Sequence, residues 1–309
     1  MVSIRHILVP VDFSECSRKA IALAADLARA LTARLTALHV YPYYVPTNDW
    51  AMDASEPAWT DTLERVEEEL RGFVTPAGAD APLAEVIVCN GETVPEILSH
   101  AGDVDLIVMG THGRRGVERW TVGSVADSVA RKAACPVLVV PPHAPGAAFA
   151  RVMCGVDLGA TSVETLEYAG MLAEATRARL VVTHVVELAS AYEPWTLYGE
   201  DEEGMRRSIT ESAARRVEAL AAAHVPPDVA MEVRVVIGQP RRELERMAGD
   251  GVDLAVVGAH STGVVQRFFF GSTADRLLRG DVCPVLFVRA PAVGGRATRA
   301  SAESHASVR

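Results

Sequence analysis

Apolar and polar positions alternate along the chain with two different periods, and their order predicts strands and helices in turn. Residues 4–11 form a short apolar run rich in β-branched side chains, which is typical of a strand. Ser14 follows this run and is suited to cap a helix. In the predicted helix, apolar residues recur at helical spacing: Ala20, Leu23, Ala24, Leu27 and Leu31. The chain is therefore predicted to open with a strand and an amphipathic helix.

The same alternation continues to residue 288. In the first half, the patterns predict further strands at 34–41, 84–89, 104–109 and 136–140, and helices at 59–73, 93–101 and 124–134. In the second half, they predict strands at 151–156, 179–186, 230–237, 252–257 and 283–288, and helices at 162–177, 203–224, 239–249 and 272–280. Strands such as LIVMG and PVLVV are apolar on both faces, as a parallel sheet covered by helices on both sides requires. Each half is therefore predicted to be a doubly wound α/β domain with five strands.

The second half of the chain repeats the first. Four pairs of segments match in the same order and with a nearly constant offset: IRHILVPVD at 4–12 with ARVMCGVD at 150–157, ARLTALHV at 33–40 with ARLVVTHV at 178–185, VDLIVMGTHG at 104–113 with VDLAVVGAHS at 252–261, and GSVADSVARKAACPVLVV at 123–140 with GSTADRLLRGDVCPVLFV at 271–288. We interpret this as a duplication joined by the Pro-, Ala- and Gly-rich stretch at 141–150. The predicted domains are residues 1–143 and 151–290.

Three segments fall outside this pattern. Residues 42–58 and 187–202 are long and contain aromatic residues and proline, so we expect loops over a ligand face or an interface. Residues 291–309 have no core pattern and are expected to form a disordered tail.

Composition and charge narrow the possible functions. The net charge of −10 over 309 residues argues against general nucleic-acid binding, which depends on a basic surface that neutralises phosphates. No run approaches the ~18 apolar residues of a membrane span, and the opening residues lack the pattern of a signal peptide. The 5 cysteines are widely spaced without a C-x-x-C pair, which favours reduced thiols over a disulfide framework or a zinc site. We therefore expect a cytoplasmic protein that contacts neither nucleic acid nor membrane.

The most informative segment is a glycine-rich connection from the fourth strand of the first half to the helix behind it. It contains Gly110, Gly113 and Gly123, and Ser124 begins the helix. Exposed backbone N–H groups and a helix N-terminus at this place favour phosphate oxygens, and Arg114 can add a guanidinium. Gly110 and Gly113 are expected to allow close backbone approach and positive φ angles. No lysine lies near the loop and no G-x-x-x-x-G-K-[ST] motif occurs, so this is not a Walker P-loop.

This loop reads G-x2-G-x9-G-[ST], which resembles the ATP-binding signature of the universal stress protein family. The opening IRHILVPVDFSECS, the segment LTALHV and the closing CPVLVVP are also similar to that family. The resemblance covers about residues 3–141 and 151–289, so the chain resembles a tandem universal stress protein. It implies a Rossmann-like sheet of the adenine nucleotide alpha hydrolase type in each half, with strand order 3-2-1-4-5 and ATP between the first and fourth strands.

The resemblance also implies roles for residues of the first half. Asp12 should meet the ribose or adenine, Pro10 and Val11 should line the base, and Val40 should contact adenine through its backbone. The phosphates should be surrounded by residues of the glycine-rich loop and the helix start: Gly110, Gly113, Arg114, Gly123, Ser124 and Val125. Two simpler interpretations stay open, namely Asp12 as a cap of the first helix and the loop as a structural turn.

The second half departs from this pattern where Ser261 replaces the second glycine. The other candidate binding residues of this half keep their places: Asp157, Val185, Gly258, Gly271, Ser272 and Thr273. If a positive φ is needed at the position of Ser261, serine costs on the order of 1 kcal/mol there, and its side chain occupies phosphate space. Alternatively, its hydroxyl donates to a phosphate. We expect weaker or altered nucleotide binding in the second half.

A stress-response module that binds ATP, ADP or AMP, with or without Mg²⁺, is the leading hypothesis for function. The alternatives are a slow ATPase or nucleotidyl-transfer enzyme and, especially for the second half, a protein-interaction module without nucleotide. His112 and His260 occupy equivalent loop positions, and we interpret them as hydrogen-bonded or solvent-facing rather than as acid–base groups. No catalytic residue or protein metal ligand is assigned, so we expect no enzyme beyond weak ATPase activity.

The last strand of each half predicts how the halves associate. CPVLVV and CPVLFV are apolar sheet edges, which are hazardous unless paired. In the resembled family these strands pair with each other. We therefore expect an intramolecular pseudo-dimer and a homodimer through the final strands.

Overall fold

The computed structural model describes residues 2–42, 56–78, 83–113, 122–144, 149–188, 202–259 and 270–289. The first half consists of β1 (His6–Pro10), α1 (Glu15–Leu31), β2 (Arg34–Pro42), α2 (Glu56–Gly78), β3 (Leu83–Gly91), α3 (Thr93–His100), β4 (Leu106–Gly110), α4 (Ser124–Lys132) and β5 (Val137–Val140). The second half consists of β6 (Arg151–Val156), α5 (Ser162–Thr176), β7 (Arg179–Val186), α7 (Glu202–His224), β8 (Met231–Ile237), α8 (Pro240–Ala248), β9 (Leu254–Gly258), α9 (Ser272–Gly280) and β10 (Val285–Val288). The predicted alternation is confirmed, whereas Arg114, Ser261 and the tail at 291–309 lie outside the described residues.

Both boundaries predicted for the second helix are wrong. The helix expected at 59–73 runs from Glu56 to Gly78, so it begins within the loop expected at 42–58 and ends five residues later than predicted. Pro57 is compatible with this start, since the first turn of a helix needs no backbone N–H from its residues. The aromatic and proline-rich character of the segment therefore did not mark where the helix begins.

The ten strands of the described residues form one continuous sheet with the order β3-β2-β1-β4-β5-β10-β9-β6-β7-β8. Each half has the predicted order 3-2-1-4-5, with parallel neighbours. The two predicted sheets are joined because β5 pairs antiparallel with β10, with Leu138 opposite Leu286. The intramolecular pairing of final strands is thus confirmed. A homodimer through the same strands is not compatible with it, because β4 and β9 occupy their other edges.

Helices cover both faces of this sheet, which explains why its strands are apolar on both sides. Ile7 and Val9 of β1 belong to one buried cluster with α1, α2, α5 and α7. Leu8, between them, belongs to a second cluster with α3, α4, α8 and α9. Each cluster continues across both halves, so the duplicated domains share their packing as well as a sheet.

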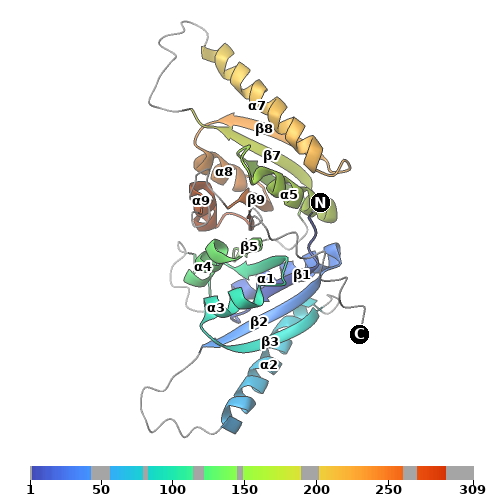
Figure 1. Ribbon diagram of the computed structural model, residues 1–309, viewed down its shortest axis with the longest axis vertical. Coiled ribbons are helices and arrows are strands. Elements are labelled where there is room, and N and C mark those ends of the chain that lie inside the picture. Colours follow the sequence, from blue (N-terminus) through green and yellow to red (C-terminus); the bar gives the residue numbers. More distant parts are fainter. Residues whose placement is uncertain are drawn as a thin grey trace, which may run out of the picture.

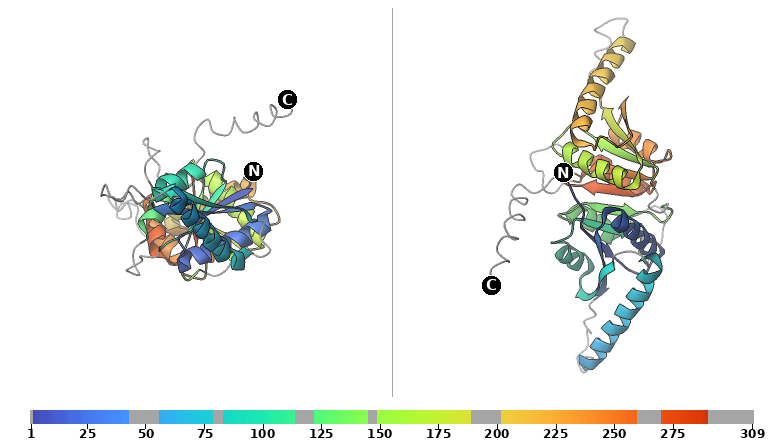
Figure 2. Two further views of the ribbon diagram at one scale, coloured as in Figure 1. Left: turned by 90° about the horizontal axis from the view of Figure 1, so that it is seen from below. Right: turned by 90° about the vertical axis from the view of Figure 1, so that its right-hand side faces the viewer.

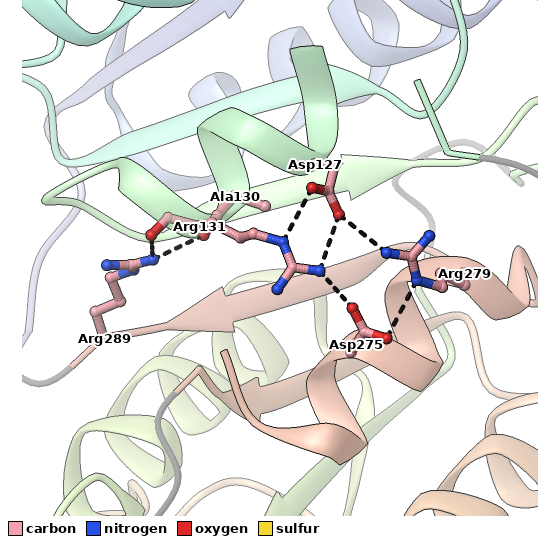
Figure 3. A network of polar contacts seen from close by, with 6 residues as sticks. All are labelled: Asp127, Ala130, Arg131, Asp275, Arg279 and Arg289. Atoms are coloured by element: carbon pink, nitrogen blue, oxygen red, sulfur yellow. Dashed lines mark hydrogen bonds and ion pairs between the residues drawn. The ribbon is translucent and has the colours of Figure 1, made fainter. Parts of the chain in front are cut away.

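An ion-pair network bridges the halves beside the β5–β10 pairing, as Figure 3 shows. Arg131 of α4 contacts Asp127 at 3.0 Å and also reaches Asp275 of α9. Arg279 repeats this arrangement, at 3.1 Å from Asp275 and 3.6 Å from Asp127. Burial by itself would raise the pKa of the Asp275 carboxyl, but hydrogen bonds from the two arginines outweigh it and lower that pKa. Asp127 and Asp275 occupy equivalent positions in the repeat, and so do Arg131 and Arg279. The junction therefore keeps the approximate two-fold symmetry of the duplication.

The molecule is elongated, with the halves meeting at its middle (Figure 1). Helices α2 and α7 extend from opposite ends, as the right-hand view of Figure 2 shows. No helix among the described residues combines the length and the apolar character that crossing a bilayer would require.

Candidate functional site

Two neighbouring strands in each half lead into helices on opposite faces of the sheet. β1 is parallel to β4, and the helices that follow them, α1 and α4, belong to the two different buried clusters. β6 and β9 repeat this arrangement with α5 and α9. In open α/β sheets, ligands bind beyond the carboxyl ends of strands at such a reversal. The strands of the two halves run in opposite directions, because β5 and β10 pair antiparallel. The carboxyl ends of the strands, and with them the two candidate sites, therefore lie on opposite sides of the molecule.

The turn after β1 places Asp12 at the first site. Phe13 has a φ of 62°, which turns the chain between the strand and α1. Ser14 caps the helix by accepting from the Ser17 N–H at 3.1 Å, and the Ser14 N–H donates to Asp12 Oδ1 at 3.1 Å. The other carboxylate oxygen, Oδ2, faces the loop after β4, since a Cβ atom added to Gly113 would lie 2.5 Å from it. Asp12 thus supports the helix start and also borders the glycine-rich loop.

The first two glycines of the loop are required for close packing and not for an unusual backbone conformation. A Cβ atom added to Gly110 would lie 2.7 Å from Cβ of Cys16 and 2.9 Å from its carbonyl carbon. Among the described residues, neither Gly110 nor Gly113 has a positive φ angle, so that prediction is wrong. Because Gly110 and Gly113 have no side chain, α1 and the turn at Asp12 can pack directly against the end of β4. Gly113 therefore gives no support to the positive φ on which the predicted cost of serine depended, and Ser261 itself lies outside the described residues.

The loop after β4 closes where α4 begins. The Gly123 N–H donates to the Thr111 carbonyl at 2.7 Å, which brings the helix start beside the end of β4. Gly123 is the N-cap of α4 and makes no side-chain cap hydrogen bond. The amides of Ser124 and Val125 lie at the positive end of the helix dipole, where an anion is favoured. Ser124 is exposed and Val125 is half-buried, so the helix start is accessible to a ligand.

Strand β2 borders the first site on the side of β1. The Val11 N–H donates to the Leu38 carbonyl at 2.8 Å. Because alternate residues of a strand direct their backbone groups to the same neighbour, Val40 directs its own toward the β1 side. Val40 lies beyond the last paired residue of β1, Pro10. His39 Nδ1 donates to the Val11 carbonyl at 2.7 Å and holds this strand end in place. Sequence analysis did not identify that role of His39.

A residue of the second half also borders the first site. Asp281, at the C-cap of α9, faces the Thr111 hydroxyl, and burial raises the pKa of its carboxyl against the opposing charge of nearby histidines. Thr111 Oγ1 lies 2.8 Å from Nδ1 of His112, whose buried Nε2 has no hydrogen-bond partner among the described residues. The contact is one-sided, because the equivalents of Asp281 and Thr111 are Ala133 and Ala259. No local pattern could have indicated it, since only the antiparallel join brings α9 to this edge.

The second site repeats the first with different contacts. Asp157 Oδ1 accepts from the Gly159 N–H at 2.8 Å and from the Ser162 hydroxyl at 2.9 Å. A Cβ atom added to Gly258 would lie 2.6 Å from Oγ1 of Thr161, so this glycine packs on α5 as Gly110 packs on α1. Val185 takes the place of Val40 on β7, next to β8.

A pocket of about 250 Å³ lies in the second half between the N-termini of α8 and α9. Its lining combines the ends of three elements: Glu187, Gln239, Pro240, Arg241, Ser272 and Thr273. Ser272 and Thr273 were predicted as binding residues, whereas the α8 residues were not. Pro240 at the first helical turn was the available signal for a second helix N-terminus. Gly271 caps α9 without a side-chain hydrogen bond. Two helix N-termini and the guanidinium of Arg241 favour an anion in this pocket, whereas the carboxylate of Glu187 in the same lining opposes one.

Comparisons with known proteins agree on both halves of the chain. A sequence model of the universal stress protein family matches residues 3–141 and 148–289. A universal stress protein of Mycobacterium tuberculosis is 27% identical over 305 residues, which cover 92% of this chain and 96% of that protein. One of Bacillus subtilis is 34% identical over 142 residues, which cover 43% of this chain and 96% of that protein. The crystal structure of a universal stress protein from Archaeoglobus fulgidus has the same fold, with a TM-score of 0.64 at 20% identity, covering 92% of this chain and 98% of that chain.

Proposed function

Because the chain belongs to the universal stress protein family and carries two domains of that family, we propose that its first half binds ATP or a related adenine nucleotide. The protein then acts as a stress-response ligand-binding module and not as an enzyme. One observation carries this proposal: Asp12, the backbone of Val40 and the start of α4 converge beyond the ends of β1 and β4.

The chemistry of these three groups matches the three parts of an adenine nucleotide. The half-buried carboxylate of Asp12 accepts hydrogen bonds from ribose hydroxyls. The backbone of Val40 offers a donor and an acceptor side by side, which suits the edge of adenine. The amides at the start of α4 suit phosphate oxygens, and Pro10 and Val11 supply apolar surface for the base.

A binding role is favoured over hydrolysis by the contacts of the nearest titratable groups. Asp12 Oδ1 accepts the Ser14 N–H, and His112 Nδ1 is bonded to Thr111. Hydrolysis requires a group that orients water against the transferred phosphoryl group. Asp12 is assigned to the ribose, and only Nε2 of the His112 ring has no partner among the described residues, so any hydrolysis should be slow. The 5 cysteines are free, which supports the proposal that the protein works in the reducing cytoplasm.

For the second half, we propose weaker binding of a phosphate-bearing ligand. The pocket between α8 and α9 supports an anion, and Ser272 and Arg241 supply a hydroxyl and a guanidinium. Asp157 Oδ1 is held by two donors of its own turn, so a ribose hydroxyl has to compete with them for this oxygen.

The proposal for the first half is tested by calorimetric titration of the full chain with ATP, ADP and AMP, with and without Mg²⁺. Gly113→Val should weaken binding at least ~10-fold, because the new side chain meets Asp12 and fills the space beside the loop. Asp12→Ala should also weaken binding about 10-fold through loss of a charged acceptor.

The matched control is Gly72→Val in α2, where an added Cβ atom meets no atom within 4 Å. This variant should bind like the unmodified protein. The proposal fails if the folded protein binds none of the three nucleotides, or if Gly113→Val binds as tightly as Gly72→Val.

A further inference from the structure

Three potential metal ligands meet between β3 and α3, away from the loop after β4. Cys89 lies on β3, and Glu96 and His100 lie one turn apart on α3. The Cys89 sulfur, a carboxylate oxygen of Glu96 and a ring nitrogen of His100 all lie within 4.8 Å of one another. All three side chains are partly exposed, so an ion from solvent can reach them. The proposed nucleotide site does not use any of them.

Local contacts position two of these side chains. A Cβ atom added to Gly91 would lie 2.7 Å from both Cγ and Oε1 of Glu96, so the glycine leaves the space that this carboxylate occupies at the end of β3. Nδ1 of His100 lies 2.9 Å from the Glu96 carbonyl oxygen, which can only accept, so Nδ1 donates. The lone pair of the neutral ring is then on Nε2. A histidine ligand is commonly oriented by such a hydrogen bond from its other nitrogen.

The second half shows that the fold does not require this set. In the repeat, Glu96 corresponds to Glu243, and a Cβ atom added to Gly238 would lie 2.9 Å from its Cγ, as in the first half. Cys89 pairs with Val40, and Val236 pairs with Val185, so these two positions are equivalent. His100 corresponds to Met247. The glutamate thus occurs in both halves as part of the same turn. The cysteine and the histidine occur only in the first half, because the second half has valine and methionine at these positions.

We propose that Cys89, Glu96 and His100 form a binding site for Zn²⁺ or a similar borderline divalent cation, with a fourth position open to water or a further ligand. Thiolate and imidazole favour such ions over Mg²⁺ and Ca²⁺, which prefer oxygen ligands. A tetrahedral zinc site with bonds of about 2.0–2.3 Å separates its ligand atoms by about 3.5 Å. The present spacing therefore closes with small side-chain rotations.

Titration of the full chain with Co²⁺ under reducing conditions, in excess Mg²⁺, tests the proposal. Co²⁺ reports a thiolate ligand by a charge-transfer absorption, and Mg²⁺ occupies oxygen-rich sites. The unmodified protein should bind one Co²⁺ with this absorption, and Zn²⁺ should displace it. Cys89→Val should abolish the absorption. His100→Met and Glu96→Gln should weaken binding at least ~10-fold.

The second half supplies both the substitutions and the control. Val and Met already occupy the equivalent positions there, so Cys89→Val and His100→Met should fold. Glu243→Gln, the same change at the equivalent glutamate, should bind Co²⁺ like the unmodified protein. The proposal is overturned if the unmodified protein shows no thiolate absorption, if Cys89→Val retains it, or if Glu243→Gln weakens binding as much as Glu96→Gln.

Discussion

At the scale of single residues, Asp12 and Asp157 occupy equivalent positions but are held differently. Asp12 Oδ1 accepts the Ser14 N–H at 3.1 Å, and Oδ2 faces the loop after β4. Asp157 Oδ1 accepts two shorter bonds from its own turn. A ligand that bonds Asp157 Oδ1 must compete with these donors. We expect the first half to be the tighter site because Gly113 leaves space beside Asp12, whereas its equivalent in the second half is Ser261.

Gly110→Ala tests the packing role of the loop glycines. The added Cβ atom would lie 2.7 Å from Cβ of Cys16 and 2.9 Å from a backbone atom of α1, which cannot rotate away. We expect the free energy of unfolding to fall by about 1–3 kcal/mol, as for other overpacked positions. Urea denaturation followed by circular dichroism measures this change.

Gly102→Ala is the control for this prediction, because its nearest non-neighbouring atom is 3.9 Å from the added Cβ atom. It should change the free energy of unfolding by no more than about 0.5 kcal/mol. Equal effects of the two substitutions would contradict the packing explanation.

At the scale of elements, the start of α8 gives the second half a feature that its counterpart α3 lacks. Arg241 lines the pocket that Ser272 and Thr273 share, whereas the equivalent position in the first half is Val94. If the second half binds a phosphate-bearing ligand as proposed, this guanidinium and the two helix N-termini favour the same anion.

Arg241→Gln should therefore weaken ATP binding to the second half about 10-fold, which corresponds to the loss of one charge-assisted hydrogen bond. Titration in a Gly113→Val background isolates this site from the first. Arg242→Gln removes the same charge one residue further along, outside the pocket lining, and should leave the affinity unchanged. If both variants lose affinity equally, the effect comes from net charge and not from the pocket.

At the scale of the whole molecule, one sheet carries both candidate sites, and they lie beyond strand ends that point in opposite directions. The join is supported by the buried clusters on both faces and by the junction of Asp127, Arg131, Asp275 and Arg279 (Figure 3). It also places Asp281 of the second half beside the first site. The second half therefore contributes a polar contact to the first site. The first half makes no equivalent contact at the second site, because the corresponding residues there are alanines.

Asp275→Asn tests the junction. The pKa of Asp275 is lowered in the folded protein, so its carboxylate stabilises the fold above its unfolded pKa of about 3.9 and loses this effect as pH falls through the lower folded value. At pH 7 the variant should be less stable by about 1 kcal/mol, a modest value because the network is partly exposed. Below about pH 4 the difference between the two proteins should narrow.

Urea denaturation at pH 7 and at pH 3 measures both expectations. The exposed residue Asp228, outside the junction, provides the control substitution Asp228→Asn. A stability difference that stays constant with pH would show that the carboxylate charge of Asp275 is not what stabilises the junction.

The sequence by itself determined the order of the elements and the duplication, and it singled out the loop on which the candidate site is proposed. Apolar spacing indicated the strands and helices because each element must present its own apolar face to a core. The matched segments indicated two equal domains. The spacing of Gly110, Gly113 and Gly123 singled out the loop after β4, where an added side chain would approach Cys16, Asp12 and Thr111 in turn.

Only the tertiary structure decided which residues of distant segments meet and why the glycines are needed. The β5–β10 pairing brings Asp281 to Thr111, and the packing of α3 on β3 gathers Cys89, Glu96 and His100. Side-chain periodicity reports which face of an element is buried, but it carries no information about which other segment covers that face. Contacts between distant residues depend on how all the elements pack together, so they could be read only from the folded chain.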